Sequence, residues 1–395
     1  MCLVASPTDA DVRLWLQFAA SPRLHAVPTY KAYPMSSNRP NRRHFLGATA
    51  AAALVAPAII TSKRTMAQEV IGTGDLRFHC KHAWPQLPES YRWQTTHNVA
   101  VDPDNNLYVI HEGLASEPDQ PSIFVFDPEG KFIRAFGQQF QGGGHGIEVR
   151  VENGEPFLYV AAYQQVKSFA KLSLTGEIVW QAFAPQQSGH YADGEASNPQ
   201  NAWGRDRFLP TNFAFLPDGG FLLADGYGSY FIHRYDDKGK WVSCFGGPGD
   251  GRGTFNTPHG IWVDNRNDES RIVVCDRANN SLQLLSLDGE YQSTIDGFGL
   301  PANVDTYEDL MLVPELVSRV SILDKNFATI ATVGDDRERI IADQKANGGF
   351  TIRGNEAAWQ QGKFVHPHDA CFDKEGNIYV AEWVATGRIS KLTRA

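Results

Sequence analysis

Short apolar runs alternate with turns of Asp, Asn and Gly along most of the chain. Residues 98–102 (Asn-Val-Ala-Val-Asp), for example, lead through an Asn-Asn turn to residues 107–109 (Leu-Tyr-Val) and on to residues 123–126 (Ile-Phe-Val-Phe). Alternation of apolar and polar side chains with a period of two predicts β-strands, and the Asp/Asn/Gly clusters predict tight turns between them. The pattern therefore predicts an all-β protein built from repeated units.

Six copies of this unit can be aligned on the residue that precedes the first strand of each copy. Equivalent positions are then 48, 66, 48, 43 and 66 residues apart, and they are occupied by His97, His145, Thr211, His259, Ala302 and His368. This spacing fits one four-stranded blade per copy, with insertions in two copies, and predicts a six-bladed β-propeller. A β-sandwich, the alternative all-β architecture, accounts poorly for six copies. The last copy lacks a fourth strand, and we expect residues 76–80 to supply it and close the ring.

Residues 1–74 do not carry the repeat. The pair Arg42-Arg43 precedes Phe45-Leu46 and an Ala-rich apolar stretch over residues 48–60, and Ala67-Gln68 offers a cleavage point. This arrangement resembles a bacterial twin-arginine export signal, and a buried Ala-rich helix is the alternative. The apolar stretch is too short to span a bilayer.

The chain is accordingly divided into four parts. They are an upstream extension over residues 1–34, a twin-arginine signal peptide over 35–67, a linker over 68–74 and the propeller over 75–395. We expect the mature protein to be periplasmic or extracellular, with no stable membrane span.

Composition and charge exclude several classes of protein. With 42% hydrophobic residues the chain can bury a large core, which excludes disorder as its main state, and a net charge of −9 argues against a nucleic-acid partner. The five cysteines include no CxxC pair, which argues against a cysteine-based zinc site. Plain buried thiols and one or two disulfide bridges both remain open.

Four of the six aligned positions hold histidine, namely His97, His145, His259 and His368. The first strand of a propeller blade is the innermost one, so these side chains are expected to meet at the mouth of the central channel. Converging neutral imidazoles predict a metal site, and three ligands with an open position are typical of catalytic zinc. Histidines hydrogen-bonded to water are the alternative. Four carboxylates of the repeats are candidates for orienting the imidazoles as hydrogen-bond acceptors, namely Asp225, Asp276, Asp369 and Glu382. The alternative is that they are turn residues.

The repeats resemble the NHL repeat, most clearly over residues 258–264 (Pro-His-Gly-Ile-Trp-Val-Asp) and 274–281. Within that superfamily, the histidine placement resembles peptidyl-α-hydroxyglycine α-amidating lyase over roughly residues 75–395. The resemblance implies a six-bladed propeller with a three-histidine Zn²⁺ and a structural Ca²⁺. It assigns His145, His259 and His368 as zinc ligands. It also assigns Tyr227, in an Asp-Gly-Tyr motif, as general base, and Arg277, in an Asp-Arg motif, as a residue that reaches the substrate.

Four positions depart from the family pattern. Glu112 stands where the family has an arginine, which disfavours an anionic substrate and suggests a carboxylate in the metal shell or a second base. His366 replaces a methionine and is a possible further ligand, as is Asp369 beside the third histidine. Gly228 replaces a cysteine and removes a disulfide, and His97 is an additional ring histidine.

The activity that the resemblance implies is cleavage of the C–N bond of an α-hydroxyglycine-type carbinolamide, giving an amide and glyoxylate. The substrate is then a small molecule or derived from a peptide. One alternative is a non-catalytic propeller that binds a protein or glycan partner on its face. Another is a lactonase-type hydrolase, which normally holds Ca²⁺ with carboxylate and amide groups, and the histidine-rich ring argues against it.

Overall fold

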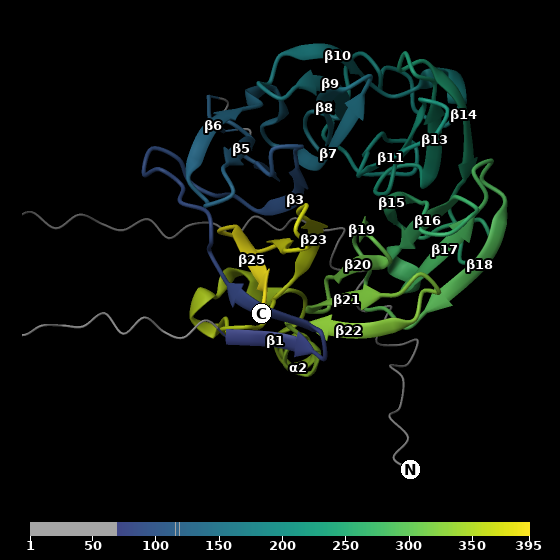
Figure 1. Cartoon of the computed structure of the whole chain (residues 1–395). Coiled ribbons are helices and arrows are strands. Elements are labelled where there is room, and N and C mark those ends of the chain that lie inside the picture. Colours follow the sequence, from purple (N-terminus) through teal and green to yellow (C-terminus); the bar gives the residue numbers. More distant parts are fainter. Residues whose placement is uncertain (1–68, 115, 118) are drawn as a thin grey trace, which may run out of the picture.

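Six antiparallel sheets are arranged in a ring in the computed structural model, which describes residues 69–114, 116–117 and 119–395 (Figure 1). The predicted all-β, six-bladed propeller is therefore confirmed. The predicted extension over 1–34 and the export signal over 35–67 lie outside the described residues. In the described part of the chain, no helix is both long enough and apolar enough to cross a membrane.

Five blades each consist of four strands that follow one another in sequence. Blade 1 contains β3 (Thr96–Val101), β4 (Leu107–His111), β5 (Ile123–Phe126) and β6 (Phe132–Phe136). Blade 2 contains β7 (Gly144–Glu152), β8 (Glu155–Ala162), β9 (Ser168–Ser173) and β10 (Ile178–Ala182). Blade 3 contains β11 (Phe213–Phe215), β12 (Phe221–Ala224), β13 (Phe231–Tyr235) and β14 (Trp241–Gly246). Blade 4 contains β15 (Pro258–Asp264), β16 (Arg271–Asp276), β17 (Ser281–Leu285) and β18 (Tyr291–Asp296). Blade 5 contains β19 (Asp305–Tyr307), β20 (Leu310–Glu315), β21 (Arg319–Leu323) and β22 (Thr329–Val333).

Blade 6 closes the ring by joining strands from both ends of the described chain (Figure 1). Its inner strands are β23 (Pro367–Phe372), β24 (Ile378–Glu382) and β25 (Arg388–Arg394), and β25 pairs with β2 (Leu76–Lys81). The strand expected at residues 76–80 is thus confirmed. The linker expected over 68–74 is wrong, because residues 69–73 form a further strand, β1 (Glu69–Thr73), which pairs with β2 along its whole length.

The core consists of apolar layers between neighbouring blades. Each blade presents two buried faces, so alternate side chains of a strand belong to different layers. Tyr108 and Ile110 of β4, for example, pack in one cluster with Leu158 and Val160 of β8. Of the four described cysteines, Cys80, Cys275 and Cys371 are buried free thiols and Cys244 is a half-buried one, so no disulfide forms among them.

Ring closure depends on Phe78, which is fully buried between blades 5 and 6. We expect the Phe78→Ala variant to lose about 3–5 kcal/mol of unfolding free energy, because a large buried side chain leaves a cavity. Urea denaturation followed by tryptophan fluorescence measures the loss. Val70→Ala on β1, where the side chain is 47% exposed, is the matched control. Equal small losses in the two variants would contradict a stabilising role for the closing strand.

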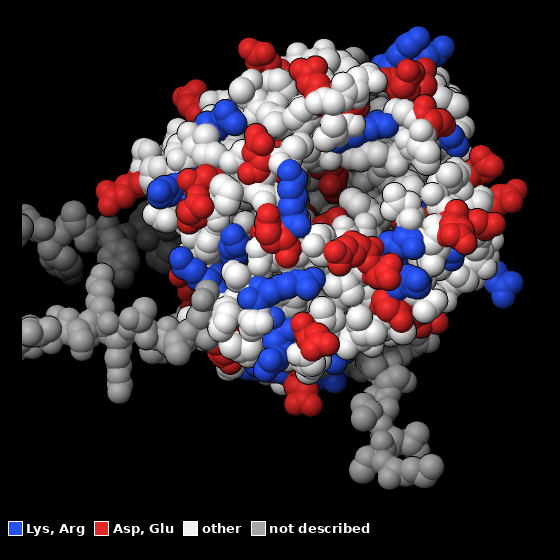
Figure 2. Space-filling model, in the orientation of Figure 1, with Lys and Arg blue, Asp and Glu red and all other residues white. Residues whose placement is uncertain are grey.

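Two long insertions account for the two 66-residue spacings. One spans residues 183–212 between β10 and β11 and contains η2 (Gln186–Ser188). The other spans residues 334–366 between β22 and β23. It contains α2 (Arg337–Asn347), η4 (Thr351–Gly354) and η5 (Glu356–Ala358). The remaining short helices are η1 (Gln138–Phe140) and η3 (Arg277–Asn279). On the face drawn in Figure 2, Lys and Arg are interspersed with Asp and Glu over the described residues.

Candidate metal centre

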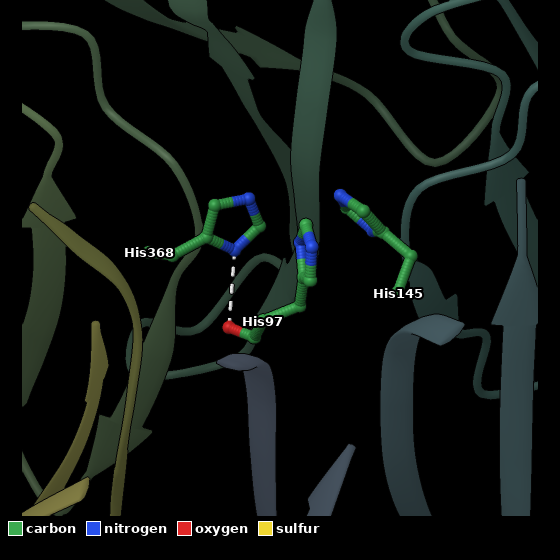
Figure 3. A group of neighbouring side chains, drawn as sticks. All are labelled: His97, His145 and His368. Atoms are coloured by element: carbon green, nitrogen blue, oxygen red, sulfur yellow. Dashed lines mark hydrogen bonds between the residues drawn. The ribbon is translucent and has the colours of Figure 1, made fainter. Parts of the chain in front are cut away.

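The four histidines of the aligned positions meet at the axis of the ring, each at most 1% exposed. Neighbouring ring centroids are 4.7 Å apart for His97–His145, His97–His368 and His259–His368, and 4.8 Å apart for His145–His259. Figure 3 shows His97, His145 and His368 approaching one another from three separate strands. The predicted convergence is therefore present in the structure.

A break in strand pairing aims each histidine at the axis. From the sequence, the four histidines are expected just before the first strand of each blade. The structure places them inside those strands, which are β3, β7, β15 and β23. The register between the first and second strands shifts at each of the four positions. A bulge of this kind leaves one residue unpaired and redirects its side chain, and it is common beside functional sites.

Three of the histidines share one hydrogen-bonding pattern. Each donates its Nδ1–H to the backbone carbonyl of the aligned residue in the following blade. The ring nitrogen must be the donor, because a carbonyl oxygen can only accept. The distances are 3.0 Å for His145 to Thr211 O, 2.6 Å for His259 to Ala302 O and 3.0 Å for His368 to His97 O. These histidines come from blades 2, 4 and 6, so they form a threefold arrangement in a six-membered ring.

Glycine makes this close approach of backbone and imidazole possible. A Cβ on Gly146 would lie 2.2 Å from Thr211 O, and a Cβ on Gly260 would lie 2.6 Å from Ala302 O. These are the two carbonyls that accept the bonds from His145 and His259. The glycines that follow His145 and His259 thus allow the carbonyl of the next blade to reach these two rings.

Because Nδ1–H is bonded to a carbonyl, the lone pair of each neutral ring lies on Nε2. Burial lowers the pKa values of His145, His259 and His368 well below the ordinary histidine value, so all three rings are neutral. Metal-ligating histidines characteristically donate their other ring N–H to a carbonyl or carboxylate. The three rings are therefore set up to ligate a metal through Nε2.

His97 differs from the other three. Neither of its ring nitrogens has a hydrogen-bond partner among the described residues, and its Nε2 lies 3.6 Å from Glu112 Oε2. One ring nitrogen each of His97, His145 and His368 lies within 4.8 Å of the other two, so these three residues are close enough together to hold one metal ion. His259 Nε2 is only 3.1 Å from His145 Nε2. We favour His145, His259 and His368 as the ligands. The His259 ring is fixed in the ligating tautomer by Ala302 O, whereas no hydrogen bond fixes the tautomer of His97.

Tyr227 and Arg277 lie directly over the imidazoles. The Tyr227 hydroxyl is 2.9 Å from His259 Nε2 and 3.4 Å from His145 Nε2. Arg277 donates from Nη1 to the Tyr227 hydroxyl at 2.9 Å, and its Nη2 lies 3.4 Å from His368 Nε2. Burial raises the pKa of Tyr227, and the charge and hydrogen bond of Arg277 act against that increase. Arg277 thus places a positive charge beside Tyr227, but the effect of burial on the pKa of Tyr227 is the larger one.

Glu112 follows β4 and lies at the rim of the centre, where it accepts a bond from Gln164 Nε2 at 2.8 Å. Burial opposes its ionisation, but the neighbouring His97, Arg353 and Gln164 stabilise the carboxylate and hold its pKa below the ordinary value. Glu112 is therefore a charged neighbour of His97 and does not contact the other three imidazoles.

His366 and Asp369 are not brought to the imidazole nitrogens. His366 directly precedes β23 and donates its Nδ1–H to Leu316 O at 2.7 Å, while its Nε2 has no hydrogen-bond partner among the described residues. Asp369 follows His368 on the same strand and points the opposite way, as successive strand residues do. Its carboxylate accepts bonds from Val99 N at 2.8 Å and Asn303 Nδ2 at 2.7 Å. The prediction of these residues as ligands of this centre is therefore corrected.

The other carboxylates considered from sequence hold turns and strand ends. Asp225 accepts from Leu209 N and Ser229 N, and Asp276 accepts from Asn256 N, Asn279 and Gln283. Glu382 pairs with Arg388 and accepts from Val365 N. None of these bonds reaches an imidazole, so the turn interpretation is the better one within the described structure.

A second polar cluster lies further along the inner strands, at positions one or three residues after the aligned positions. Glu148, Asp305 and Asp369, with Asn303, line a cavity of about 110 Å³. Burial raises the pKa values of Asp305 and Asp369 to about 7 and that of Glu148 above its ordinary value. Asn212 bonds to Glu148 and Asn303, but its Oδ1 has no partner among the described residues. Carboxylate and amide oxygens suit Ca²⁺, so these residues fit the calcium that the resemblance implies.

Metal-free protein should lose stability as the pH rises from about 4 to 7. Asp305 has an ordinary pKa near 3.9 in the unfolded chain and about 7 when folded, so the folded state binds the proton more tightly. Deprotonation in this range therefore costs folding free energy. Added Ca²⁺ should raise the melting temperature at pH 7 and remove this loss. The Asp305→Asn variant should lose less stability over this pH range and respond more weakly to Ca²⁺, whereas Asp369, with a raised pKa of about 7, still contributes. A response to pH and Ca²⁺ equal to that of the wild type would contradict the assignment.

The chain matches no family model and none of the curated proteins. Solved structures place it among six-bladed propellers, which include enzymes. A streptogramin B lyase superposes with a TM-score of 0.50 at 13% identity, over 80% of this chain and 98% of that one. A gluconolactonase from Xanthomonas campestris superposes with a TM-score of 0.51 at 10% identity, over 80% of this chain and 90% of that one. Identities this low show the fold alone. The chain is a six-bladed propeller with four histidines at its axis and is similar in fold to lyases and lactonases.

Proposed function

We propose that this propeller is an exported, metal-dependent lyase that cleaves the C–N bond of an α-hydroxyglycine-type carbinolamide. The products are an amide and glyoxylate. One observation carries the proposal. Neutral imidazoles from blades 2, 4 and 6, each fixed by a carbonyl of the next blade, point Nε2 toward a hydroxyl and a guanidinium that lie directly above them.

The donor set fits zinc. Three imidazole nitrogens with an open position form the usual ligand set of a catalytic Zn²⁺, whereas Ca²⁺ and Mg²⁺ prefer oxygen donors. His145, His259 and His368 would hold the ion. When bound, zinc acts as a Lewis acid that polarises the substrate hydroxyl.

Tyr227 moves the proton in the proposed reaction. As a phenolate it takes the proton of the substrate hydroxyl, the C–O bond becomes a carbonyl, and the C–N electron pair goes to the nitrogen. The Tyr227 hydroxyl then returns the proton to that nitrogen, so atoms and charge balance. Arg277 stabilises the phenolate through its bond to the Tyr227 oxygen and offers further N–H groups to the substrate carboxylate. The same ionised form of Tyr227 would be favoured by the positive charge of a metal held by His145, His259 and His368.

Two rival functions account for less of the site. A propeller that only binds a protein or glycan partner on its face has no need for a buried hydroxyl and guanidinium above neutral imidazoles. A lactonase of the calcium type holds its ion with carboxylate and amide oxygens, whereas these donors are imidazole nitrogens. The oxygen-rich cluster around Glu148 and Asp305 lies away from Tyr227 and suits a structural cation.

Glyoxylate release tests the proposed function. Zinc-loaded protein is incubated with N-benzoyl-α-hydroxyglycine, and glyoxylate and benzamide are quantified. We expect the two products in equal amounts, their loss after chelation, and their recovery when zinc is restored. Protein that binds zinc but releases no glyoxylate above the uncatalysed rate would contradict the lyase assignment.

A further inference from the structure

We propose that Arg353, in the insertion between blades 5 and 6, binds the anionic end of the substrate. The residue lies outside every repeat position, so the repeat alignment gives no indication of it. The identity of the substrate rests on the proposed function. The preference for a carboxylate can be tested without any turnover.

The structure fixes Arg353 firmly. Its backbone carbonyl accepts a bond from Ala385 N at 3.0 Å. Its guanidinium carbon lies 3.6 Å from the centre of the Trp383 ring, which is the distance of a stacked cation–π contact. Its Nη2 donates to Thr95 Oγ1 at 3.1 Å. The planar group is therefore held in one orientation before any ligand arrives.

Thr95 places Arg353 beside the metal centre. The Thr95 hydroxyl accepts the bond from Arg353, and the Thr95 carbonyl accepts a bond from Glu112 N at 2.8 Å. Arg353 is close enough to act electrostatically on Glu112, His97 and Tyr163. The charge of Arg353 therefore acts on His97 of the axial cluster and on two of its neighbours.

Arg353 and Arg277 both retain unused donors. The Nε atoms of both side chains are buried and have no hydrogen-bond partner among the described residues. A guanidinium carries five N–H donors, and a buried donor without an acceptor is costly, so an incoming acceptor is favoured. A carboxylate satisfies paired guanidinium donors better than a neutral oxygen does.

The charge balance of the site also favours an anion. Glu112 is the departure from the family pattern that argues against an anionic substrate. Arg353 and Arg277 supply two positive charges against its single negative charge, before any metal is counted. Arg353 thus restores the positive charge that the chain lacks at position 112, from a different element of the fold.

The uncharged part of such a substrate has an aromatic surface available. Trp203, from the insertion between blades 2 and 3, is 48% exposed, and its ring lies 5.4 Å from that of Tyr227 and 6.0 Å from that of Tyr163. The substrate class that fits is therefore a carboxylate that carries a planar or apolar acyl group. N-benzoylglycine has this chemistry, and N-benzoylglycinamide is its neutral counterpart.

Calorimetric titration of the full, zinc-loaded protein with these two compounds tests the proposal. We expect the wild type to bind the acid at least about tenfold more tightly than the amide, as loss of a charge-assisted hydrogen bond weakens binding by about that factor. Arg353→Gln should lose about tenfold in acid affinity and leave amide affinity unchanged. Arg353→Lys should fall between the two. Arg337→Gln is the matched control, because Arg337 lies in the same insertion and pairs with Asp335.

Three results would overturn the proposal. One is wild-type protein that binds the acid no better than the amide, or binds neither. Another is an Arg353→Gln variant that keeps the acid preference. The third is an equal loss of both affinities with a lowered melting temperature, which would assign Arg353 a structural role. An acid preference that depends on Arg353, found in protein that releases no glyoxylate, would support this inference while contradicting the proposed lyase activity.

Discussion

His259→Ala should remove nearly all bound zinc from the protein. His259 supplies one of three Nε2 atoms, and its ring is held in the ligating tautomer by Ala302 O. Loss of an outer hydrogen bond to a metal ligand already costs about 10–100-fold in affinity, and loss of the ligand itself should cost more. Elemental analysis after dialysis against a weak chelator measures the zinc content per chain.

Two further variants make this result specific. His97→Ala should keep most of its zinc, because the His97 ring has no fixed tautomer and is not in the favoured trio. His233→Ala removes another buried histidine, one that bonds to Tyr191 and Trp241 away from the axis, and it should also keep its zinc. Zinc retained in His259→Ala but lost in His97→Ala would show that the trio of His97, His145 and His368 is the metal site.

Tyr227→Phe should lower kcat for glyoxylate release by about 10²–10⁴-fold, which is the usual contribution of a positioned acid or base. The hydroxyl lies 2.9 Å from both His259 Nε2 and Arg277 Nη1, so its removal takes away the one group placed to accept the substrate proton. Zinc content should remain at the wild-type level, because the imidazoles are untouched. Steady-state kinetics and metal analysis on the same preparation measure both quantities.

Tyr230→Phe is the control for this experiment. Its hydroxyl bonds to Thr257 Oγ1 at 3.1 Å and makes no bond to an imidazole, so kcat should change little. Equal losses in the two variants, or a Tyr227→Phe enzyme that retains wild-type kcat, would contradict the role of Tyr227 in proton transfer.

The repeat made the fold predictable, and the exceptions have physical causes. Every blade repeats the same alternation, so six copies and the closing strand at 76–80 follow from the pattern. Strand β1 was missed because it has no counterpart in other blades and pairs only with β2. A short strand at the outer edge of a sheet has no periodic signal that distinguishes it from a linker.

The candidate site was predictable only where it follows the repeat. Aligned positions in a ring must face one another, so the convergence of the histidines follows from the alignment. The carbonyls that fix their tautomers belong to the backbone of the following blade, and no side-chain pattern encodes them. The sequence suggests Asp369 as a ligand because it is next to His368. Its side chain lies on the opposite face of the strand and bonds to Val99 N and Asn303 instead. Asp305 and Glu148 lie three residues after Ala302 and His145, so a shifted alignment of the same repeat identifies them.

The central claim is a metal held by three imidazoles from alternate blades. X-ray absorption at the zinc edge of the purified, zinc-loaded protein tests it most directly. The account predicts three imidazole nitrogens at about 2.0–2.1 Å, with one further light-atom ligand in the open position. In His259→Ala, any residual zinc should show fewer imidazoles. A sulfur shell near 2.3 Å, or fewer than three imidazoles in the wild type, would contradict the account.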